Sequence, residues 1–404
     1  MNELLDYAAV RDSLIARLVP VGTESVSLPA CAGRVLAEDL IALEDIPPFD
    51  RSPYDGYAFR AADTVNASPD SPVTLRVLET VPAGSTPTRT ISVGTAVRLM
   101  TGAPIPDGAD AVCMFEKTAF TEDSVTLFTP LHAGENIIFA GEDVAKGAVL
   151  AYRGDRIDAG IAGTLAAQGQ ARPLVYRRVR VGLISTGNEV VEADARPLAG
   201  QIRNSNRSML EAALSREGME AVYLGLAGDD TSCIVRLITE GVERCDAVIL
   251  TGGVSVGDYD LTPAAMDAAG CETICRGVAL KPGMACAYGM LRGKPICGLS
   301  GNPASSLTNF CLIALPALRR MAGWNRPVPQ EIKLTLRTPF RKKSPFTRVL
   351  RGRLDLADGT VGLVLPGDQG NVVLSSTIGC NAMAIVPAGS GPLAEGAVLK
   401  GFLL

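Results

Sequence analysis

The alternation of apolar and helical segments between residues 178 and 321 constrains the fold of this chain more than any other feature. The apolar runs cover residues 179–187, 220–228 and 246–253, and each ends in glycine. Helical segments lie between them, at 205–218 with Ser205 as N-cap and Gly218 as stop, and at 229–245 with acids in the first turn. Strands and helices that alternate at these lengths predict a doubly wound, mostly parallel sheet with helices on both faces.

The remaining segments predict further folding units around this sheet. Residues 3–19 have helical periodicity, and a long helix is expected over 303–321, after strands near 275–280, 285–290 and 295–299. The stretch 46–59 is dense in proline and turn residues and marks a boundary. Short strands with frequent turns follow over 60–142 and again over 331–404, which predicts a small β-rich domain and a C-terminal β-barrel or sandwich.

Composition excludes several functional classes. The net charge is −5 and aromatic residues make up 5% of the 404 residues, which argues against a nucleic-acid surface. No apolar run approaches the ~20 residues of a membrane span, and the first twenty residues lack the pattern of a signal peptide, so a cytoplasmic protein is expected. Ten scattered cysteines and the single histidine, His132, favour neither a zinc site nor a serine–histidine nucleophile.

Three loops rich in glycine and hydroxyl groups follow strands of the predicted sheet, where ligands bind in such folds. The first contains Ser185, Thr186 and Gly187; the second Gly252, Gly253, Ser255 and Gly257; the third Gly301, Asn302 and Pro303 at the start of a helix. Each loop alone is equally well explained as a tight turn. Three at one sheet edge favour a ligand that carries phosphate, because backbone N–H groups there bind anions.

Acidic residues accompany the same loops. Glu189 follows the first strand, Asp229 and Asp230 the second, and Asp258 and Asp260 the third, although Asp230 is equally well read as a helix N-cap. Carboxylates next to phosphate repel it unless a divalent cation lies between them, so the pattern predicts Mg²⁺ and phosphoryl or nucleotidyl chemistry. Basic residues are few: Lys281 follows a predicted strand, and Arg348, Arg351 and Arg353 are each expected at the surface when taken alone.

Seven ordered motifs give the chain a resemblance to a known family. They are DGYAF (55–59), MTGAPIPDGADAV (100–112), GEDV (141–144), STGNEV (185–190), GGVSVGDYD (252–260), LKPG (280–283) and GNPASS (301–306). Together they resemble the molybdopterin molybdotransferase (MoeA) family, which shares its fold with the C-terminal domain of gephyrin. The likeness spans nearly the whole chain.

The resemblance implies an architecture. It places a discontinuous N-terminal domain at 1–45 and 143–177, an inserted β-rich domain at 46–142, a molybdopterin-binding α/β domain at 178–326 and a C-terminal β-barrel at 327–404. It also implies a homodimer, in which the α/β domain of one subunit and the inserted domain of the other build each active site. Contacts with the molybdopterin adenylyltransferase and with molybdoenzyme acceptors would follow.

The resemblance further implies a reaction and its residues. Adenylylated molybdopterin and molybdate bind, the pyrophosphate link is cleaved with Mg²⁺, and AMP leaves. The acids that would hold the metal or activate water are Asp55, Asp143, Glu189, Asp229 or Asp230, and Asp260, with Asp55, Glu189 and Asp260 as metal ligands. Thr101 and Ser255 match positions that line the ligand site. Lys281, Arg348 and Ser375 match the molybdate pocket.

Three departures from the family pattern bear on specificity. Met284 stands where the family commonly has a lysine, Ser300 where it often has a proline, and Asn188 where it often has an aspartate. Loss of one cation beside a dianion weakens binding by about 1–3 kcal/mol. A tungstate-inserting enzyme or divergent paralogue, and a non-catalytic pterin-binding scaffold, are retained as alternatives, while the acids at 55, 143, 189 and 260 favour the enzyme.

Overall fold

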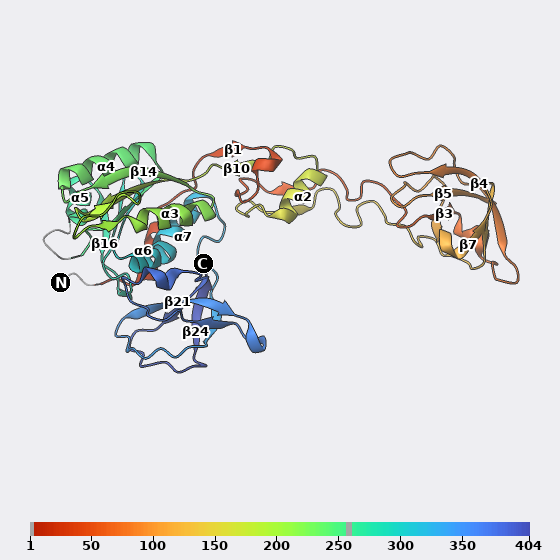
Figure 1. Ribbon diagram of the computed structural model, residues 1–404. Helices are drawn as coiled ribbons and strands as arrows, with labels where there is room; N and C mark the ends of the chain where they lie inside the picture. The colour runs from red at the N-terminus through yellow and green to blue at the C-terminus, as the bar shows by residue number, and fades with distance from the viewer. Residues whose placement is uncertain (1–3, 256–260) are drawn as a thin grey trace. The chain divides into compact units, whose positions relative to one another are not determined.

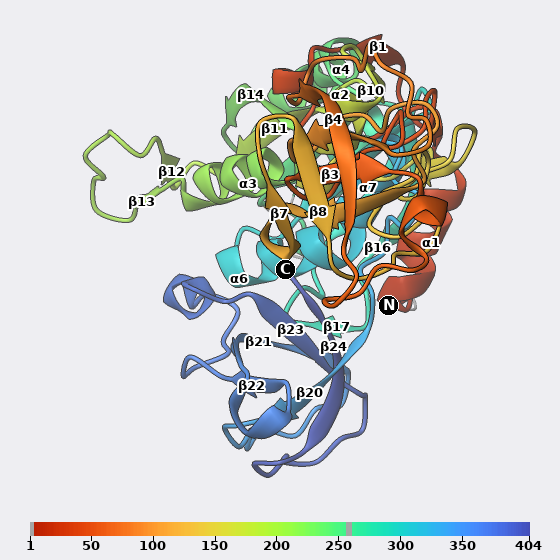
Figure 2. The same cartoon turned by 90° about the vertical axis from the view of Figure 1, so that its right-hand side faces the viewer.

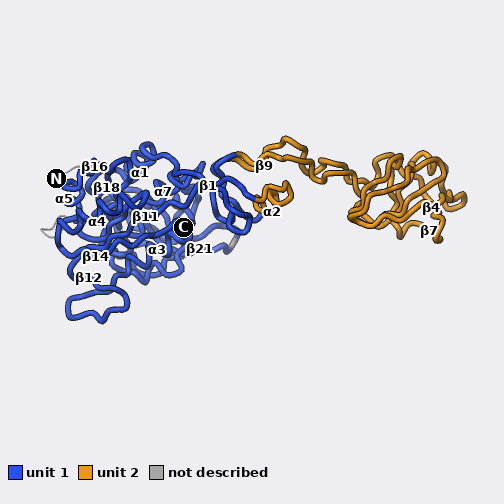
Figure 3. The backbone as a smooth tube through the Cα atoms, turned by 90° about the horizontal axis from the view of Figure 1, so that it is seen from above, with its two compact units in different colours: residues 1–38, 153–159, 172–404 blue, residues 39–152, 160–171 orange. Residues whose placement is uncertain are grey.

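The computed structural model describes residues 4–255 and 261–404 and divides the chain into two compact units (Figure 3). Unit 1 comprises Met1–Glu38, Arg153–Ala159 and Arg172–Leu404, and unit 2 comprises Asp39–Tyr152 and Gly160–Ala171. No helix in the described part of the chain is long and apolar enough to cross a membrane.

The predicted doubly wound sheet is present in unit 1, with strand order β14-β11-β15-β19-β18-β16. Its strands are β14 (Glu220–Ala227), β11 (Arg180–Thr186), β15 (Ala247–Thr251), β19 (Lys294–Leu299), β18 (Ala287–Leu291) and β16 (Glu272–Arg276). The first four are parallel, and β18 and β16 continue the sheet antiparallel. The sheet is therefore mostly parallel, as the alternation of strands and helices indicates.

Helices cover both faces of this sheet (Figure 1). On one face lie α1 (Tyr7–Ala16), α3 (Ser205–Arg216), α6 (Pro303–Asn309) and α7 (Leu315–Met321), and on the other α4 (Thr231–Arg244) and α5 (Thr262–Ala268). Val181 and Ile249 face the first group, and Val248 and Leu250 face the second. A strand buried on both sides needs apolar side chains at every position, which explains the continuous apolar runs.

Two predicted helices differ in detail. Asn204, not Ser205, caps α3, and its side chain accepts a hydrogen bond from the N–H of Arg207 at 3.2 Å; asparagine and serine cap equally well, so propensity did not separate them. The long helix expected over 303–321 is interrupted by a π-helical turn at Phe310–Ala314. Pro316, which has no N–H to donate, lies two residues after the end of this turn.

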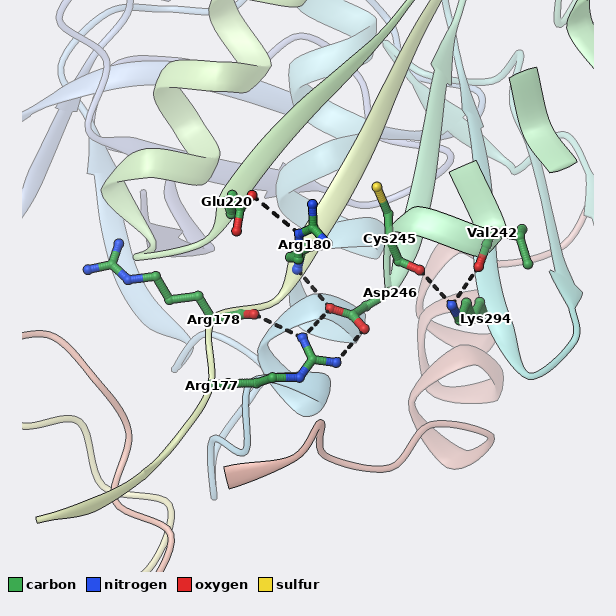
Figure 4. Close-up of polar contacts among 8 residues, drawn as sticks. All are labelled: Arg177, Arg178, Arg180, Glu220, Val242, Cys245, Asp246 and Lys294. Atoms are coloured by element: carbon green, nitrogen blue, oxygen red, sulfur yellow. Dashed lines mark hydrogen bonds and ion pairs between the residues drawn. The ribbon is translucent and has the colours of Figure 1, made fainter. Parts of the chain in front are cut away.

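The amino ends of the parallel strands are held by a charged cluster (Figure 4). Arg177 donates two hydrogen bonds to Asp246, at 2.7 and 2.6 Å, and the N–H of Arg180 donates to the same carboxylate at 2.9 Å. Burial raises the pKa of Asp246, but the bonds from Arg177 and Arg180 outweigh it and lower the pKa overall. Lys294 donates to the carbonyls of Val242 and Cys245 and so caps the end of α4.

Unit 2 contains a six-stranded sheet of order β6-β3-β5-β4-β8-β7, part of which is visible in Figure 2. The strands are β3 (Gly56–Phe59), β4 (Val73–Val81), β5 (Thr95–Leu99), β6 (Ala111–Met114), β7 (Thr118–Phe120) and β8 (Ser124–Leu127). A small apolar core lies on each face of this sheet. The unit also contains β2 (Leu40–Ile41), paired with β9 (Val149–Ala151), and most of α2 (Ala159–Ala167). The paired strands β1 (Thr23–Ser25) and β10 (Leu174–Tyr176) belong to unit 1.

The C-terminal region of unit 1 is a closed five-stranded β-barrel, as the sequence predicts. The ring runs β21-β22-β20-β24-β23 and closes by pairing of β23 with β21. Its strands are β20 (Ile332–Leu336), β21 (Thr347–Asp355), β22 (Gly362–Val364), β23 (Ala382–Val386) and β24 (Val398–Leu403). The short β17 (Leu280–Lys281), from the α/β part, pairs with β21 and joins the two parts.

Candidate functional site

The loops predicted at the carboxyl ends of β11, β15 and β19 lie against one another. Thr186 Oγ1 donates to the carbonyl of Thr251 at 3.2 Å, and the N–H of Gly252 donates to the carbonyl of Leu299 at 3.0 Å. A Cβ added at Gly301 would lie 3.5 Å from the Cα of Gly252. The structure therefore brings the predicted residues Ser185, Thr186, Gly187, Gly252, Gly253, Gly301, Asn302 and Pro303 to one edge of the sheet.

Glycine at position 252 is required by this close packing. Its φ is +102°, and a Cβ would lie 2.6 Å from Thr186 Oγ1 and 2.8 Å from the Thr186 carbonyl oxygen. Gly253 also has a positive φ, of +61°. The glycines of this loop therefore let two strand ends approach each other more closely than any side chain permits.

We expect Gly252→Ala to destabilise the sheet edge, because alanine would clash with a backbone carbonyl in a conformation that L-residues avoid. The expected loss is about 2–4 kcal/mol in the free energy of unfolding, measured by chemical denaturation. Gly270→Ala is the matched control, since its φ of +84° is also positive but nothing lies within 4 Å of the added Cβ. Equal losses in the two variants would mean that the clash with Thr186 contributes nothing.

Two asparagines, which the sequence reasoning missed, tie helix α3 to these loops. Asn204 Nδ2 donates to Ser185 Oγ at 2.9 Å, and Asn206 Nδ2 donates to the carbonyl of Gly301 at 2.8 Å. Asn206 Oδ1 and Ser306 Oγ are buried without a partner among the described residues. Unsatisfied buried polar atoms are rare, so these two mark hydrogen-bonding capacity that the described residues next to the loops leave unused. The sequence signal was available: Asn204 and Asn206 begin a helix at the expected sheet edge.

The acids at this edge are in different environments. Asp230 is the N-cap of α4, and its Oδ1 accepts from the Ser232 hydroxyl at 2.6 Å and from the Ser232 N–H at 2.9 Å. These bonds, the hydroxyl first, lower its pKa. Asp229 and Glu189 are exposed, and the N–H of Asp229 donates to Asn188 Oδ1 at 3.2 Å, which joins the loop after β11 to the loop after β14. Of the two aspartates, Asp229 is the one whose carboxylate is not used in capping.

The predicted metal ligands are not assembled within the described residues. Residues 4–255 and 261–404 contain no group of three or more acidic, cysteine or histidine side chains placed to hold a metal ion. Asp260 and Gly257 lie outside the described residues, and Ser255 is the last one described before them. Asp55, Thr101 and Asp143 belong to unit 2, whereas Glu189, Asp229 and Asp230 belong to unit 1.

Asp55 and Thr101 form a hydrogen-bonded pair on the surface of unit 2. Asp55 Oδ1 accepts from the Thr101 N–H at 2.7 Å and from the Thr101 hydroxyl at 2.8 Å. These bonds, the backbone one first, and the nearby Arg98 hold the pKa of Asp55 below its ordinary value. Asp143 is exposed in a turn of the same unit, with its N–H bonded to the carbonyl of Ile46 at 3.0 Å.

We expect Thr101→Val to raise the pKa of Asp55, because the hydroxyl bond to the charged form is lost while the backbone bond remains. A depressed pKa keeps the carboxylate ionised to lower pH than in a free aspartate. Any activity that needs this carboxylate should then fall off at a higher pH in the variant than in the wild type. NMR titration of the Asp55 carboxyl carbon measures the pKa directly, and an unchanged or lower value would contradict the expectation. Thr88→Val, whose hydroxyl bonds Glu79 instead, is the control.

Lys281 and Arg348, two of the three residues predicted to bind an oxyanion, lie where β17 pairs with the barrel strand β21. Lys281 and Arg348 are partners in the register of β17 and β21, so they are neighbours, and Lys281 is exposed. Arg348, expected at the surface, is in fact 7% exposed; its Nε donates to Ser344 Oγ at 3.0 Å and its guanidinium lies over the Phe340 ring. Burial lowers its pKa. Ser375 is exposed in the short helical turn Leu374–Thr377.

Arg351 is a second correction, because surface solvation was expected and the side chain is fully buried. Its Nη2 donates to Ser376 Oγ at 3.0 Å and to the carbonyl of Gly370 at 3.3 Å, while Nε and Nη1 have no partner among the described residues. No carboxylate pairs with it there, and burial lowers its pKa. Arg353, by contrast, is exposed as expected. No signal in the sequence pointed to this burial, because β21 also carries Arg348 and Arg353.

The barrel residues around Arg351 contact the third loop of the α/β part. The N–H of Ala304, in the first turn of α6, donates to the carbonyl of Asn371 at 3.2 Å, five residues before Ser376. Asn309 Nδ2 donates to the carbonyl of Gly283 at 2.9 Å and so fixes the loop that begins with Lys281. The strand-end loops and the cations Lys281, Arg348 and Arg351 are thus joined through α6 within unit 1.

Comparison with known proteins identifies matches along the whole chain. Residues 5–169 match the MoeA N-terminal region (domain I and II), residues 182–320 a probable molybdopterin binding domain, and residues 333–403 the MoeA C-terminal region (domain IV). A molybdopterin molybdenumtransferase of Staphylococcus aureus is 37% identical over 366 residues, covering 91% of this chain and 87% of the relative. That of Staphylococcus epidermidis is 35% identical over 372 residues, covering 92% and 89%.

A solved structure is similar over the same extent. The crystal structure of the molybdopterin biosynthesis MoeA protein from Pyrococcus horikoshii superposes with a TM-score of 0.86 at 30% identity and covers 100% of both chains. A molybdenum cofactor biosynthesis protein from Pyrococcus furiosus, at 18% identity and a TM-score of 0.61, shares the fold.

Proposed function

This chain belongs to the MoeA family, and from that premise we propose that it is a molybdopterin molybdotransferase of molybdenum cofactor biosynthesis. It would insert molybdate into adenylylated molybdopterin with Mg²⁺-dependent release of AMP. The observation that carries the proposal is that unit 1 joins two sites of different chemistry. Strand-end loops with backbone donors suit a phosphate-bearing pterin, and the adjoining barrel edge supplies cations to an oxyanion.

The cations have distinct proposed roles. Arg351 offers two buried N–H groups without partners, and a doubly charged oxyanion would satisfy both. Lys281 brings a mobile point charge from the neighbouring strand, and Arg348 is held by Ser344 and Phe340. Ser375 adds a hydroxyl donor beside the buried Ser376, which already binds Arg351. Arg351 is three residues from Arg348 on β21, so the two side chains leave opposite faces of the strand. We therefore propose Arg351 as a further cation of the molybdate site, on the side of Ser375 and Ser376.

The carboxylates suit the proposed Mg²⁺, since hard oxygen ligands are the ones this cation prefers. Glu189 and Asp229 are exposed beside the strand-end loops, and we propose them as ligands with Asp260 and, from unit 2, Asp55. When bound, the cation would offset the negative charge of the pyrophosphate. Asp230 is less suited, because its carboxylate already caps α4.

We also propose that the protein forms a homodimer, as the family resemblance implies. Exposed apolar side chains support the idea that unit 2 binds a second copy: Leu43 is 53% exposed and Phe49 43% exposed. Light scattering coupled to size-exclusion chromatography tests this, and a monomer at micromolar concentration would count against it.

The experiment that tests the function is AMP release from adenylylated molybdopterin by the purified protein with Mg²⁺, run with molybdate, with tungstate and with neither. Release that requires molybdate supports the proposal. Release with tungstate alone would favour the alternative of a tungstate-inserting enzyme. Pterin binding without release under any anion would favour the non-catalytic scaffold.

We expect Met284→Lys to strengthen molybdate binding about tenfold, because it adds a cation three residues from Lys281 and a charge-assisted contact contributes roughly 1.5–3 kcal/mol. Met284 is only half-buried, so a lysine can reach solvent or ligand. The dissociation constant from isothermal titration is the measurement. Met284→Gln is the control for size, and an equal gain there would mean that charge is not the cause.

A further inference from the structure

We propose that Arg98, in the sheet of unit 2, binds a phosphate group of the nucleotide-bearing substrate. The inference rests on the proposed function and adds a binding residue to the Asp55–Thr101 pair. Nothing in the resemblance or the loop pattern pointed to this position. Three observations within unit 2 point to Arg98: its register in the sheet, its contacts with aromatic rings, and its N–H groups that have no acceptor among the described residues.

The register of the sheet places Arg98 beside Asp55. Arg98 in β5 lies directly opposite Tyr57 in β3, and Asp55 precedes Tyr57 by two positions. Residues directly opposite each other on paired strands share a face, so Tyr57 and Arg98 lie on one face of the sheet. Asp55 lies in the bend just before β3, and the charge of Arg98 is close enough to lower the pKa of its carboxyl group. Asp55 stays next to the strand pair because the N–H of Phe115 donates to its carbonyl at 2.9 Å.

Aromatic rings position the guanidinium of Arg98. Its Cζ lies 5.1 Å from the centroid of Phe115 and 5.7 Å from that of Phe120. The two rings are packed at 4.4 Å, and Tyr57 stacks on Phe115 at 6.5 Å with an angle of 12°. Arginine stacks on aromatic faces while its N–H groups stay available at the edge of the plane, so this arrangement fixes the side chain before a ligand arrives.

The N–H groups of Arg98 have no acceptor. Throughout the described residues, Arg98 makes neither a side-chain hydrogen bond nor an ion pair, although the side chain is half-buried. Arg98 lies close enough to lower the pKa of Asp55 but forms no ion pair with it, and Asp55 Oδ1 accepts both hydrogen bonds of Thr101. The guanidinium of Arg98 therefore has five N–H donors that can bind an anion. The solvent-facing carboxylate of Asp55 can bind the Mg²⁺ that accompanies this anion.

A phosphate oxygen is the group that fits these donors. Guanidinium and phosphate match in bidentate geometry, and Arg is favoured over Lys for this reason. The substrate of the proposed reaction carries a pyrophosphate with several negative charges. Arg98 would supply a further positive charge to bind it. The competing explanation is that Arg98 only covers the Phe115 and Phe120 rings. In that case an apolar side chain at position 98 would leave substrate binding unchanged.

The test compares Arg98→Met, Arg98→Lys and Arg76→Met in the full-length protein. Methionine keeps the apolar cover of the two rings and removes the positive charge. Lysine keeps the positive charge but lacks the planar guanidinium that binds phosphate through two N–H groups. Arg76, exposed on the neighbouring β4, is the control. Binding of adenylylated molybdopterin is measured by pterin fluorescence with EDTA present, and AMP release is measured separately with Mg²⁺ and molybdate. Circular dichroism checks that each variant folds.

We expect Arg98→Met to weaken binding by about 10- to 100-fold, Arg98→Lys by less, and Arg76→Met by less than twofold. Binding by Arg98→Met equal to that of the wild type would overturn the proposal, since it would show that the rings need only an apolar cover. A wild-type protein that neither binds nor cleaves the substrate would instead overturn the proposed function. The two failures are therefore distinguishable.

Discussion

Asp55→Asn should lower the rate of molybdate-dependent AMP release by about 10²-fold or more, the usual scale for a carboxylate that takes part in catalysis. Asparagine retains an oxygen that can accept both hydrogen bonds from Thr101, so the local structure should persist. What is lost is the negative charge that would face Mg²⁺ and the substrate. The substitution should therefore lower the rate of AMP release and raise the Mg²⁺ concentration required for half-maximal rate. The free energy of unfolding should not change.

Asp70→Asn is the matched control for this variant, because Asp70 is an exposed aspartate in the same unit. Its rate should stay within about twofold of the wild type, as for most surface substitutions. Thermal unfolding should coincide for all three proteins. A normal rate in Asp55→Asn at saturating Mg²⁺ would remove Asp55 from the catalytic set and shift the role to Asp143 or Glu189.

The fold of the α/β part was predictable because its signal is redundant. Val248 and Ile249 lie on opposite faces of the sheet and are both fully apolar, so burial on two sides is visible in the sequence itself. The loops at 185–187, 252–253 and 301–303 follow from the strand assignments, because the carboxyl ends of parallel strands meet at one edge. The interruption of the helix at Phe310–Ala314 was not predictable from periodicity, which a π-helical turn shifts only locally.

The two arginines that carry the new proposals could not be assigned from sequence alone. Arg351 is one of three arginines in β21, and it is buried because the segment that contains Gly370 and Ser376 packs on its side chain. Arg98 has ordinary neighbours in sequence, and its environment comes from Phe115 and Phe120, which are distant along the chain. Burial of a charge depends on tertiary contacts, so residue type and spacing give too little information.

Arg351→Met should have opposite effects on function and stability. Molybdate-dependent release of AMP should fall by about 10²- to 10³-fold, the loss seen when one positioned donor to a developing or bound oxyanion is removed. The free energy of unfolding should be unchanged or higher by about 1–3 kcal/mol, because methionine removes a buried cation that has no carboxylate partner among the described residues. The hydrogen bonds lost to Ser376 and Gly370 contribute about 0.5–1.5 kcal/mol each and set the lower end of this range.

This pair of measurements separates a ligand-binding arginine from a structural one. A structural Arg351 would show a loss of at least about 2 kcal/mol on substitution, with activity falling only as the folded fraction falls. Arg353→Met, two residues along the same strand and exposed, should leave both quantities near wild type. Burial lowers the pKa of Arg351, and a bound anion would offset the free-energy cost of the buried charge. Molybdate should accordingly raise the unfolding temperature of the wild type and of Arg353→Met, and leave that of Arg351→Met unchanged.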